Sequence, residues 1–262
     1  MRKAVVAAAL VALSLPAGAQ DFQVAARASA EADYKVSKGF HIAFEEELRS
    51  EDGLSAIGSF RHSLTVRYKP DRHFRFDLGY TLINPWESCP RHRFLADLGG
   101  SLYPGDWQIS LKERFQVTHN TNPGLNINQK PRNAMALKSK ASVQYRGIKH
   151  FEPYFSVEVR TFLNGAWGST SGTIQTTEKT KKKYFDYTPE GYTHIYNNRY
   201  RSELGAGIRL ARHHHLTPYL LLDYCSDYKI DTNREGTRLF VATTAWTEVL
   251  RLSPGIAYVY RF

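Results

Sequence analysis

The sequence has no long apolar run beyond its first few dozen residues. A polytopic helical membrane protein needs several runs of about 20 apolar residues, so this class is excluded. Cysteine and methionine are scarce, with 2 of each in 262 residues. Cys89 and Cys225 belong to no C-x-x-C motif or metal-ligand spacing. They are compatible with one disulfide or with two free thiols.

Aromatic residues, by contrast, are plentiful, with 16 tyrosines and 14 phenylalanines. Such a composition argues against disorder and suits β-strands, in which aromatic side chains are enriched. Lysine and arginine (35) outnumber aspartate and glutamate (25), and the formal net charge is +10. These totals alone describe a soluble basic protein, which makes the distribution of the residues decisive.

The N-terminal residues 1–19 are typical of a secretory signal peptide. Arg2 and Lys3 form a basic region, an apolar stretch follows, and Ala17-Gly18-Ala19 forms an A-x-A-like cleavage site. No cysteine follows that site, so a lipoprotein signal is not indicated. We expect export, cleavage near Ala19 and a single mature domain of residues 20–262. Export argues against nucleic acid as a partner of the basic chain.

Hydrophobic residues recur with period two through the rest of the chain, which indicates strands and not helices. In one run Phe74, Phe76, Leu78 and Tyr80 alternate with Arg75, Asp77, Gly79 and Thr81. The runs extend over about 10–16 residues, whereas about 9–11 tilted residues cross a bilayer core. The sequence therefore predicts an all-β protein whose strands are long enough to span a membrane.

Apolar and polar residues alternate along the strands of both soluble and membrane barrels. Three further features favour the membrane barrel. Aromatic residues cluster at strand ends, as in interfacial girdles. Acids and bases interleave on the charged face, so that they can pair inside a narrow lumen. The chain also ends in a strand with Tyr258, Tyr260 and Phe262, which resembles the targeting signal read by the outer-membrane barrel assembly machinery.

Turn signals divide the chain into alternating short and long connections. Short turns are expected at residues 37–39, 69–71, 104–106, 147–149 and 212–214, and long connections at 50–55, 84–91, 120–132 and 164–194. If residues 237–262 form a hairpin, twelve strands close antiparallel. If only residues 248–262 span, eleven strands remain and closure needs a parallel seam. We expect an up-and-down antiparallel transmembrane barrel of about twelve strands. The pattern does not decide which side of the membrane carries the long loops.

The charged face suggests a site inside the barrel. We expect a lumen charge cluster on the middle strands, made of Lys112, Arg114, Lys138, Lys140, Glu158, Arg160, Arg201 and Glu203. Such a cluster either pairs internally and plugs the lumen or lines a passive pore for small, possibly anionic, solutes. Wide aqueous channels belong to barrels of 16–18 strands, so a plug with a structural or partner-binding role is favoured.

Several chemical signatures are weak or absent. The tract His213-His214-His215 suggests a metal site, but consecutive strand residues face opposite sides, so a polar turn is favoured and no metal site or cofactor is expected. A membrane-embedded lipid hydrolase stays an alternative, without a nucleophile-elbow motif to support it. Residues 179–183 are rich in lysine and would contact lipopolysaccharide phosphates if that loop is extracellular.

Five fragments together are similar to a known family. They are Glu45-Glu46-Glu47-Leu48-Arg49, His92-Arg93, Leu111-Lys112-Glu113-Arg114-Phe115-Gln116, Glu152-Pro153-Tyr154-Phe155-Ser156-Val157-Glu158, and Arg199-Tyr200-Arg201 with Gly205. Their order and spacing resemble an uncharacterised outer-membrane β-barrel family of Gram-negative bacteria, domain of unknown function 2490, over essentially the whole mature chain. The resemblance implies fold and outer-membrane location, with lipid and lipopolysaccharide as surroundings. It implies no activity, so no enzyme is expected, and a monomer is the default.

Overall fold

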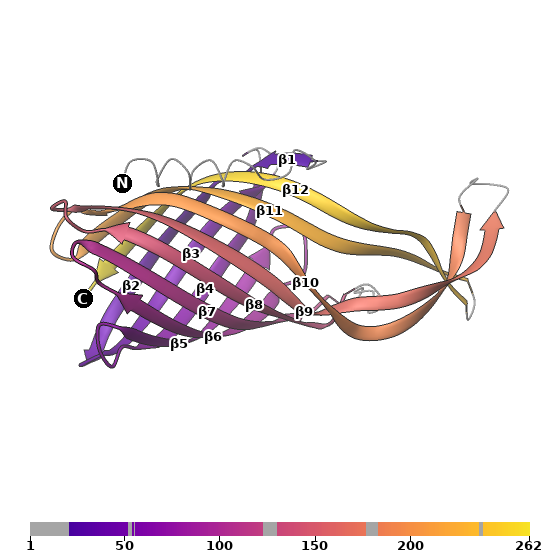
Figure 1. Cartoon of the computed structure of the whole chain (residues 1–262), viewed down its shortest axis with the longest axis horizontal. Coiled ribbons are helices and arrows are strands. Elements are labelled where there is room, and N and C mark those ends of the chain that lie inside the picture. Colours follow the sequence, from indigo (N-terminus) through magenta and orange to yellow (C-terminus); the bar gives the residue numbers. More distant parts are fainter. Residues whose placement is uncertain (1–20, 52–53, 55, 123–129, 177–182, 236–237) are drawn as a thin grey trace.

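The protein is described here by a computed structural model that covers residues 21–262 except 52–53, 55, 123–129, 177–182 and 236–237. The expected signal peptide lies outside the described residues. The chain forms one twelve-stranded sheet (Figure 1). No helix of the described residues is long and apolar enough to cross a membrane. The strands are β1 (Asp21–Val24), β2 (Arg27–Ser37), β3 (Phe40–Glu51), β4 (Ala56–Tyr68), β5 (Phe74–Pro85), β6 (Arg91–Leu102), β7 (Trp107–Asn120), β8 (Asn133–Tyr145), β9 (Phe151–Thr176), β10 (Lys183–Arg209), β11 (His214–Glu235) and β12 (Arg238–Arg261).

Strands β2 to β12 pair antiparallel with their neighbours in sequence order, and β12 pairs with β2 to close the sheet into a barrel. The all-β fold and the count of about twelve strands are thus confirmed. The closing pair is parallel, with Ile256 opposite Ala28 and Tyr260 opposite Ala32. Strand β1 continues this parallel seam at Val249–Leu252, in the middle of β12. Eleven strands therefore form the wall, and β1 adds a short twelfth.

The expected antiparallel closure is wrong, because residues 238–261 form one strand and not a hairpin. Strand β12 pairs with β11 from Arg238 to Tyr260, so no residues are left for a further crossing. The C-terminus lies at the end of the barrel that carries the short turns, where the Arg261 N–H donates to the carbonyl of His213. This is the arrangement that the eleven-strand alternative required.

All five expected short turns separate the strands as predicted. In the β4–β5 turn, the Asp71 carboxylate accepts hydrogen bonds from the backbone N–H groups of His73 (2.6 Å) and Phe74 (2.9 Å). These bonds lower the pKa of Asp71 below its ordinary value. In the β2–β3 turn, Gly39 has a positive φ of 77°, which explains a glycine at this position.

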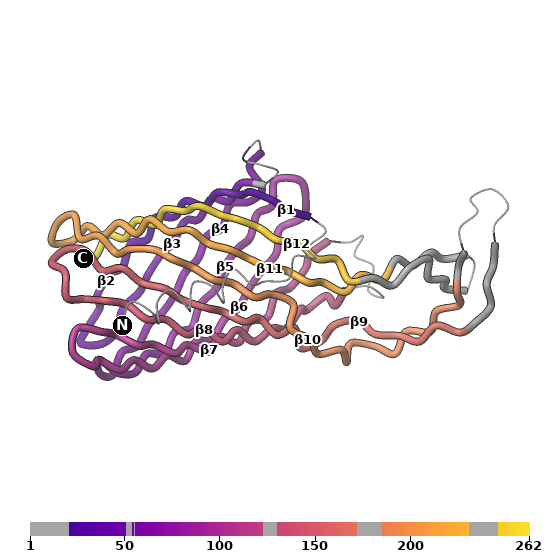
Figure 2. Tube along the Cα trace, turned by 45° about the horizontal axis from the view of Figure 1, so that its top comes forward, coloured from indigo at the N-terminus to yellow at the C-terminus, as the bar shows by residue number. Residues whose placement is uncertain are grey.

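The expected long loop at residues 164–194 is instead largely a β-hairpin. Strands β9 and β10 contain 26 and 27 residues, and β11 and β12 contain 22 and 24. Strands β2 to β8 contain only 11 to 14. Figures 1 and 2 show β9–β12 projecting beyond the barrel as an extension. Of the lysines in residues 179–183, Lys179, Lys181 and Lys182 lie outside the described residues.

The extension has its own small apolar core. Ala166, Tyr187 and Ile230 are buried together, and Phe185 and Tyr228 pack against them. A further antiparallel pairing joins β10 to β12 at Phe185–Val241. This packing supports backbone pairing well past the barrel rim.

Candidate functional site

The two faces of the barrel wall differ sharply in chemistry. The face that encloses the interior carries buried polar and charged residues, which include Arg27, Asp33, Arg67, Asp77, Asp97, Gln116, Ser156, Arg199, Asp223 and Ser253. The outer face carries exposed aliphatic and aromatic residues, which include Phe44, Leu64, Phe76, Leu78, Phe94, Leu98, Leu111 and Leu204. Because water-soluble proteins bury apolar and expose charged residues, this arrangement is inverted.

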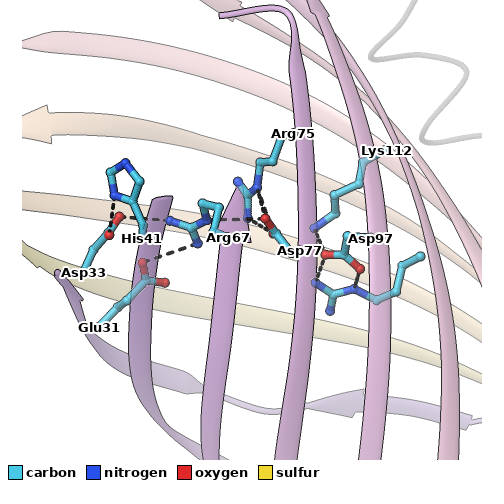
Figure 3. Close-up of polar contacts among 9 residues, drawn as sticks. Glu31, Asp33, His41, Arg67, Arg75, Asp77, Asp97 and Lys112 are labelled. Carbon is cyan, nitrogen blue, oxygen red and sulfur yellow. Dashed lines mark hydrogen bonds and ion pairs between the residues drawn. The ribbon is translucent and has the colours of Figure 1, made fainter. Parts of the chain in front are cut away.

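One ion-pair network in the lumen is centred on Arg67 of β4. Its guanidinium donates to Asp33 on β2 at 2.9 Å and lies 3.6 Å from Asp77 on β5. Asp33 also contacts the His41 ring at 2.9 Å, and Arg75 forms a second ion pair with Asp77. Figure 3 shows these side chains in a continuous chain across four strands. The network ties β2–β5 together from inside the barrel.

The next group holds two residues of the predicted cluster. Arg114 donates two hydrogen bonds to Asp97, at 2.6 and 2.7 Å. Lys112 donates a third to the same carboxylate at 3.2 Å (Figure 3). The Asp97 side chain is only 1% exposed. A buried carboxylate requires such charge-assisted partners, because an unpaired charge in a low dielectric is strongly disfavoured. Lys112 and Arg114 are therefore paired here with an acid outside the predicted set.

A third group surrounds Asp223 of β11. Arg201 binds this carboxylate with two hydrogen bonds, at 2.6 and 2.9 Å, and Arg27 of β2 approaches from the other side at 3.1 Å. Nearby, Arg199 donates to Glu158 at 2.5 Å. Arg201 and Glu158 were predicted members of the cluster, and each has an ionic partner that the prediction did not include.

The remaining predicted residues differ in their partners. Lys140 lies 3.6 Å from Glu203, which also accepts a hydrogen bond from the Tyr154 hydroxyl at 2.7 Å. Arg160 donates to the neutral amide oxygen of Asn198 at 2.6 Å. Lys138 has no hydrogen bond, and no carboxylate within ion-pair distance, among the described residues, and it is attracted at longer range to Glu158. The eight predicted positions thus lie on one face, but they form several groups and not one site.

Two tyrosine rings also lie on the inner face beside these charges. Tyr154 lies against Gly205 and Tyr219 against Gly255 on neighbouring strands. A Cβ atom at position 255 would lie 2.2 Å from the Tyr219 ring, so only glycine leaves room for the ring. Such glycine–aromatic pairs cover the backbone of glycine in a sheet. In the barrel they also occupy interior space.

Sequence reasoning missed the acids at the centre of the networks. Asp33, Asp77, Asp97 and Asp223 each bind at least one arginine or lysine, and none was assigned to the predicted cluster. Their position on the polar face could be read from period two. Most of their partners could not, because every pair except Arg75–Asp77 joins residues from different strands at a stagger that only the assembled barrel sets.

The predicted targeting residues lie on the closing strand. Tyr258 and Tyr260 are opposite Ala30 and Ala32 across the parallel seam. The Phe262 N–H donates to the carbonyl of Asp33, and its ring contacts Tyr34. The terminal strand thus pairs with β11 on one side and with β2 on the other.

Other candidate chemistry finds little support in the described part of the chain. Cys89 and Cys225 are free thiols. In the histidine tract, the His213 ring bonds the Arg261 carbonyl and the His214 ring bonds the Tyr258 hydroxyl. Within the described ranges, no three potential metal ligands converge. Nor does any serine hydroxyl there bond a histidine ring, the pair that a serine hydrolase needs.

Comparison with known proteins places the chain in a family. The family described as "Protein of unknown function (DUF2490)" matches residues 28–176, which is more than half of the chain. The chain belongs to this family. The DUF2490 match covers strands β2–β9 and does not reach β10–β12. It includes four of the five fragments on which the sequence resemblance rested. No protein in the curated collection matches the chain.

Proposed function

We propose that this protein is a monomeric integral β-barrel of the outer membrane with a charge-filled lumen and a structural or partner-binding role. The observation that carries the proposal is the inverted wall, with charges buried inside and apolar side chains exposed outside. A contiguous apolar surface of this extent is unfavourable in water. A bilayer removes the penalty, and strands β2–β8, at 11–14 residues, match the length that a tilted spanning strand needs.

Biogenesis follows from the same proposal. Residues 1–19 direct export, and the C-terminal Tyr258, Tyr260 and Phe262 are read by the barrel assembly machinery. The short-turn end, which holds the C-terminus, would then face the periplasm, and the β9–β12 extension would face outward among lipopolysaccharide. A partner-binding role finds its support in this extension, which exposes Trp167 and Trp246.

The interior supports a plug and not an open channel. Asp77, Asp97 and Asp223 are almost fully buried, and cations from several strands surround them. Tyr154 and Tyr219 occupy further interior space. An excess of arginine and lysine favours a second candidate, a passive pore for small anions. Single-channel recording separates the two: the plug predicts no stable conductance, and a steady anion-selective conductance would establish the pore.

Membrane location is tested by fractionation. We expect the mature protein in outer membranes after a urea wash, because urea removes peripheral proteins but not a spanning barrel. Mature protein recovered in the soluble periplasm would refute the proposal. A chain tagged after Phe262 should be avoided, since it alters the strand that is proposed to direct assembly.

A further inference from the structure

Four cations lie directly opposite one another on adjacent strands in the lumen. The register aligns Arg114 of β7 with Lys138 of β8, Lys138 with Arg160 of β9, and Arg160 with Arg199 of β10. Like charges directly opposite in a sheet are destabilising. Such a row inside a barrel calls for negative charge close by.

The carboxylates on this wall compensate only the ends of the row. Arg114 is bound by Asp97 and Arg199 by Glu158. In the described structure the two central cations have no carboxylate within ion-pair distance: Arg160 donates to an amide oxygen, and Lys138 is attracted only at longer range to Glu158, which Arg199 already binds. The centre of the row therefore carries more positive than negative charge.

Strands β4 and β6 add cations within electrostatic range of this row or of one another. The Nε of Arg93 on β6 donates to the Thr118 hydroxyl at 3.1 Å, and its guanidinium is within electrostatic range of Arg49, Arg160 and Arg199. Arg61 of β4 lies within range of both Arg49 and Arg93. The buried Nε groups of Arg49 and Arg61 lack a hydrogen-bond acceptor, and a carboxylate oxygen of Glu47 lies 3.9 Å from the Arg61 Nε. Guanidinium groups from several strands thus point into one region of the lumen.

We call this region the basic zone and define it as Arg49, Arg61, Arg93, Lys138, Arg160 and Arg199. Its six cations lie beside three carboxylates, Glu47, Glu158 and Asp223, and each of these is already bound by at least one arginine. Arginine does not deprotonate in proteins, so the excess cannot be removed by proton loss from the guanidinium groups. An anion from solution would compensate it.

We propose that the basic zone is a binding site for a small polyvalent oxyanion of the phosphate class. Guanidinium groups present paired N–H donors that match phosphate oxygens, and a lysine adds a compact positive charge. The closed wall separates the zone from surrounding lipid, which favours a free anion over a lipid headgroup. We assign Lys138, Arg160 and Arg93 as its principal ligands, because none of the three has a carboxylate within ion-pair distance in the described part of the chain.

Inorganic phosphate is the probe. The complete mature protein, folded in detergent micelles without lipid, is titrated with phosphate and, separately, with chloride at matched ionic strength, and binding is measured by equilibrium dialysis and by the thermal unfolding midpoint. We expect saturable binding and a rise in the midpoint with phosphate only. Equal stabilisation by chloride, or no saturable binding, would overturn the proposal.

Variants locate the site. Lys138→Gln and Arg160→Gln should each weaken phosphate binding about tenfold or more, as expected for loss of one charged hydrogen-bond partner. Arg75→Gln is the matched control, since Arg75 is paired with Asp77 and lies outside the zone; its phosphate affinity should equal that of the wild type. Removal of Lys138 relieves repulsion, so without phosphate that variant should unfold no earlier than the wild type. Unchanged phosphate affinity in folded Lys138→Gln and Arg160→Gln would refute the assignment. The outcome does not depend on cellular location, so it can fail while the proposed function stands.

Discussion

Arg27 and Asp223 are 196 residues apart in the sequence, yet their side chains form a buried ion pair of 3.1 Å in the lumen. Arg27 lies on β2 and Asp223 on β11, and β12 runs between these strands. The pair therefore bridges the closing strand on the inner face. Nearby, Arg251 of β12 donates a hydrogen bond of 2.7 Å to the side-chain oxygen of Gln23 on β1. Polar contacts thus reinforce the seam at which the barrel closes.

Loss of the Asp223 carboxylate should destabilise the barrel strongly. Asp223→Asn leaves Arg27 and Arg201 buried without their anion, and removal of one partner of a buried pair costs about 3–5 kcal/mol. Urea unfolding in lipid vesicles measures the change. Asp106→Asn, in an exposed turn, is the control and should change the free energy of unfolding by less than about 0.5 kcal/mol. Equal stability of Asp223→Asn and the wild type would contradict a role for the pair.

A methyl group at Gly255 should displace the Tyr219 ring. A Cβ there would lie 2.2 Å from the ring, so Gly255→Ala should cost about 1–3 kcal/mol, as overpacking does. Gly207→Ala is the matched control, because its Cβ would meet Glu152 at an ordinary 3.8 Å. Unfolding of both variants by urea gives the comparison. Similar stability of the two would show that Tyr219 does not lie on Gly255.

Charge on the outer wall should be costly only where the wall meets lipid. Leu78 is 67% exposed on β5, and Leu78→Arg should destabilise the membrane-inserted barrel by up to about 2–4 kcal/mol, depending on depth. Trp86 is 69% exposed but follows the end of β5, so Trp86→Arg should have a much smaller effect. Refolding into vesicles followed by urea titration measures both. A Leu78→Arg variant as stable as Trp86→Arg would show that position 78 does not meet lipid.

The parallel seam predicts a specific cross-link. Ala28 and Ile256 are direct neighbours across it, so Ala28→Cys with Ile256→Cys should form a disulfide under mild oxidation, in a background with Cys89 and Cys225 replaced by serine. The control pair, Ala28→Cys with Leu252→Cys, is displaced by four residues, or roughly 13 Å, and should not link. Gel mobility before and after reduction reports the bond. Linkage of the control pair alone would refute the register.

The local pattern of the sequence predicted most strands and turns, because each residue of a half-buried strand reveals its face by alternation. The projecting hairpin was missed, since Gly165, Gly168, Pro189 and Gly191 interrupt that alternation and are typical of loops. Parallel closure was not predicted because alternation does not record which edge a strand meets. In the lumen, Lys112 and Arg114 were recognisable as inward-facing, but their shared partner Asp97 depends on the pairing of β6 with β7.

Nitroxide accessibility along β7 distinguishes a lipid-facing wall from a water-facing one. Single spin labels replace Ile109, Ser110 and Leu111 in a background without Cys89 and Cys225, and the protein is reconstituted in lipid vesicles. Ile109 and Leu111 are exposed outward, whereas Ser110 faces the lumen and bonds Ser101. We predict high collision rates with oxygen and low rates with a water-soluble nickel complex at positions 109 and 111, and the reverse preference at 110. Nickel accessibility at 109 and 111 equal to that of an exposed turn would contradict a barrel that spans the membrane.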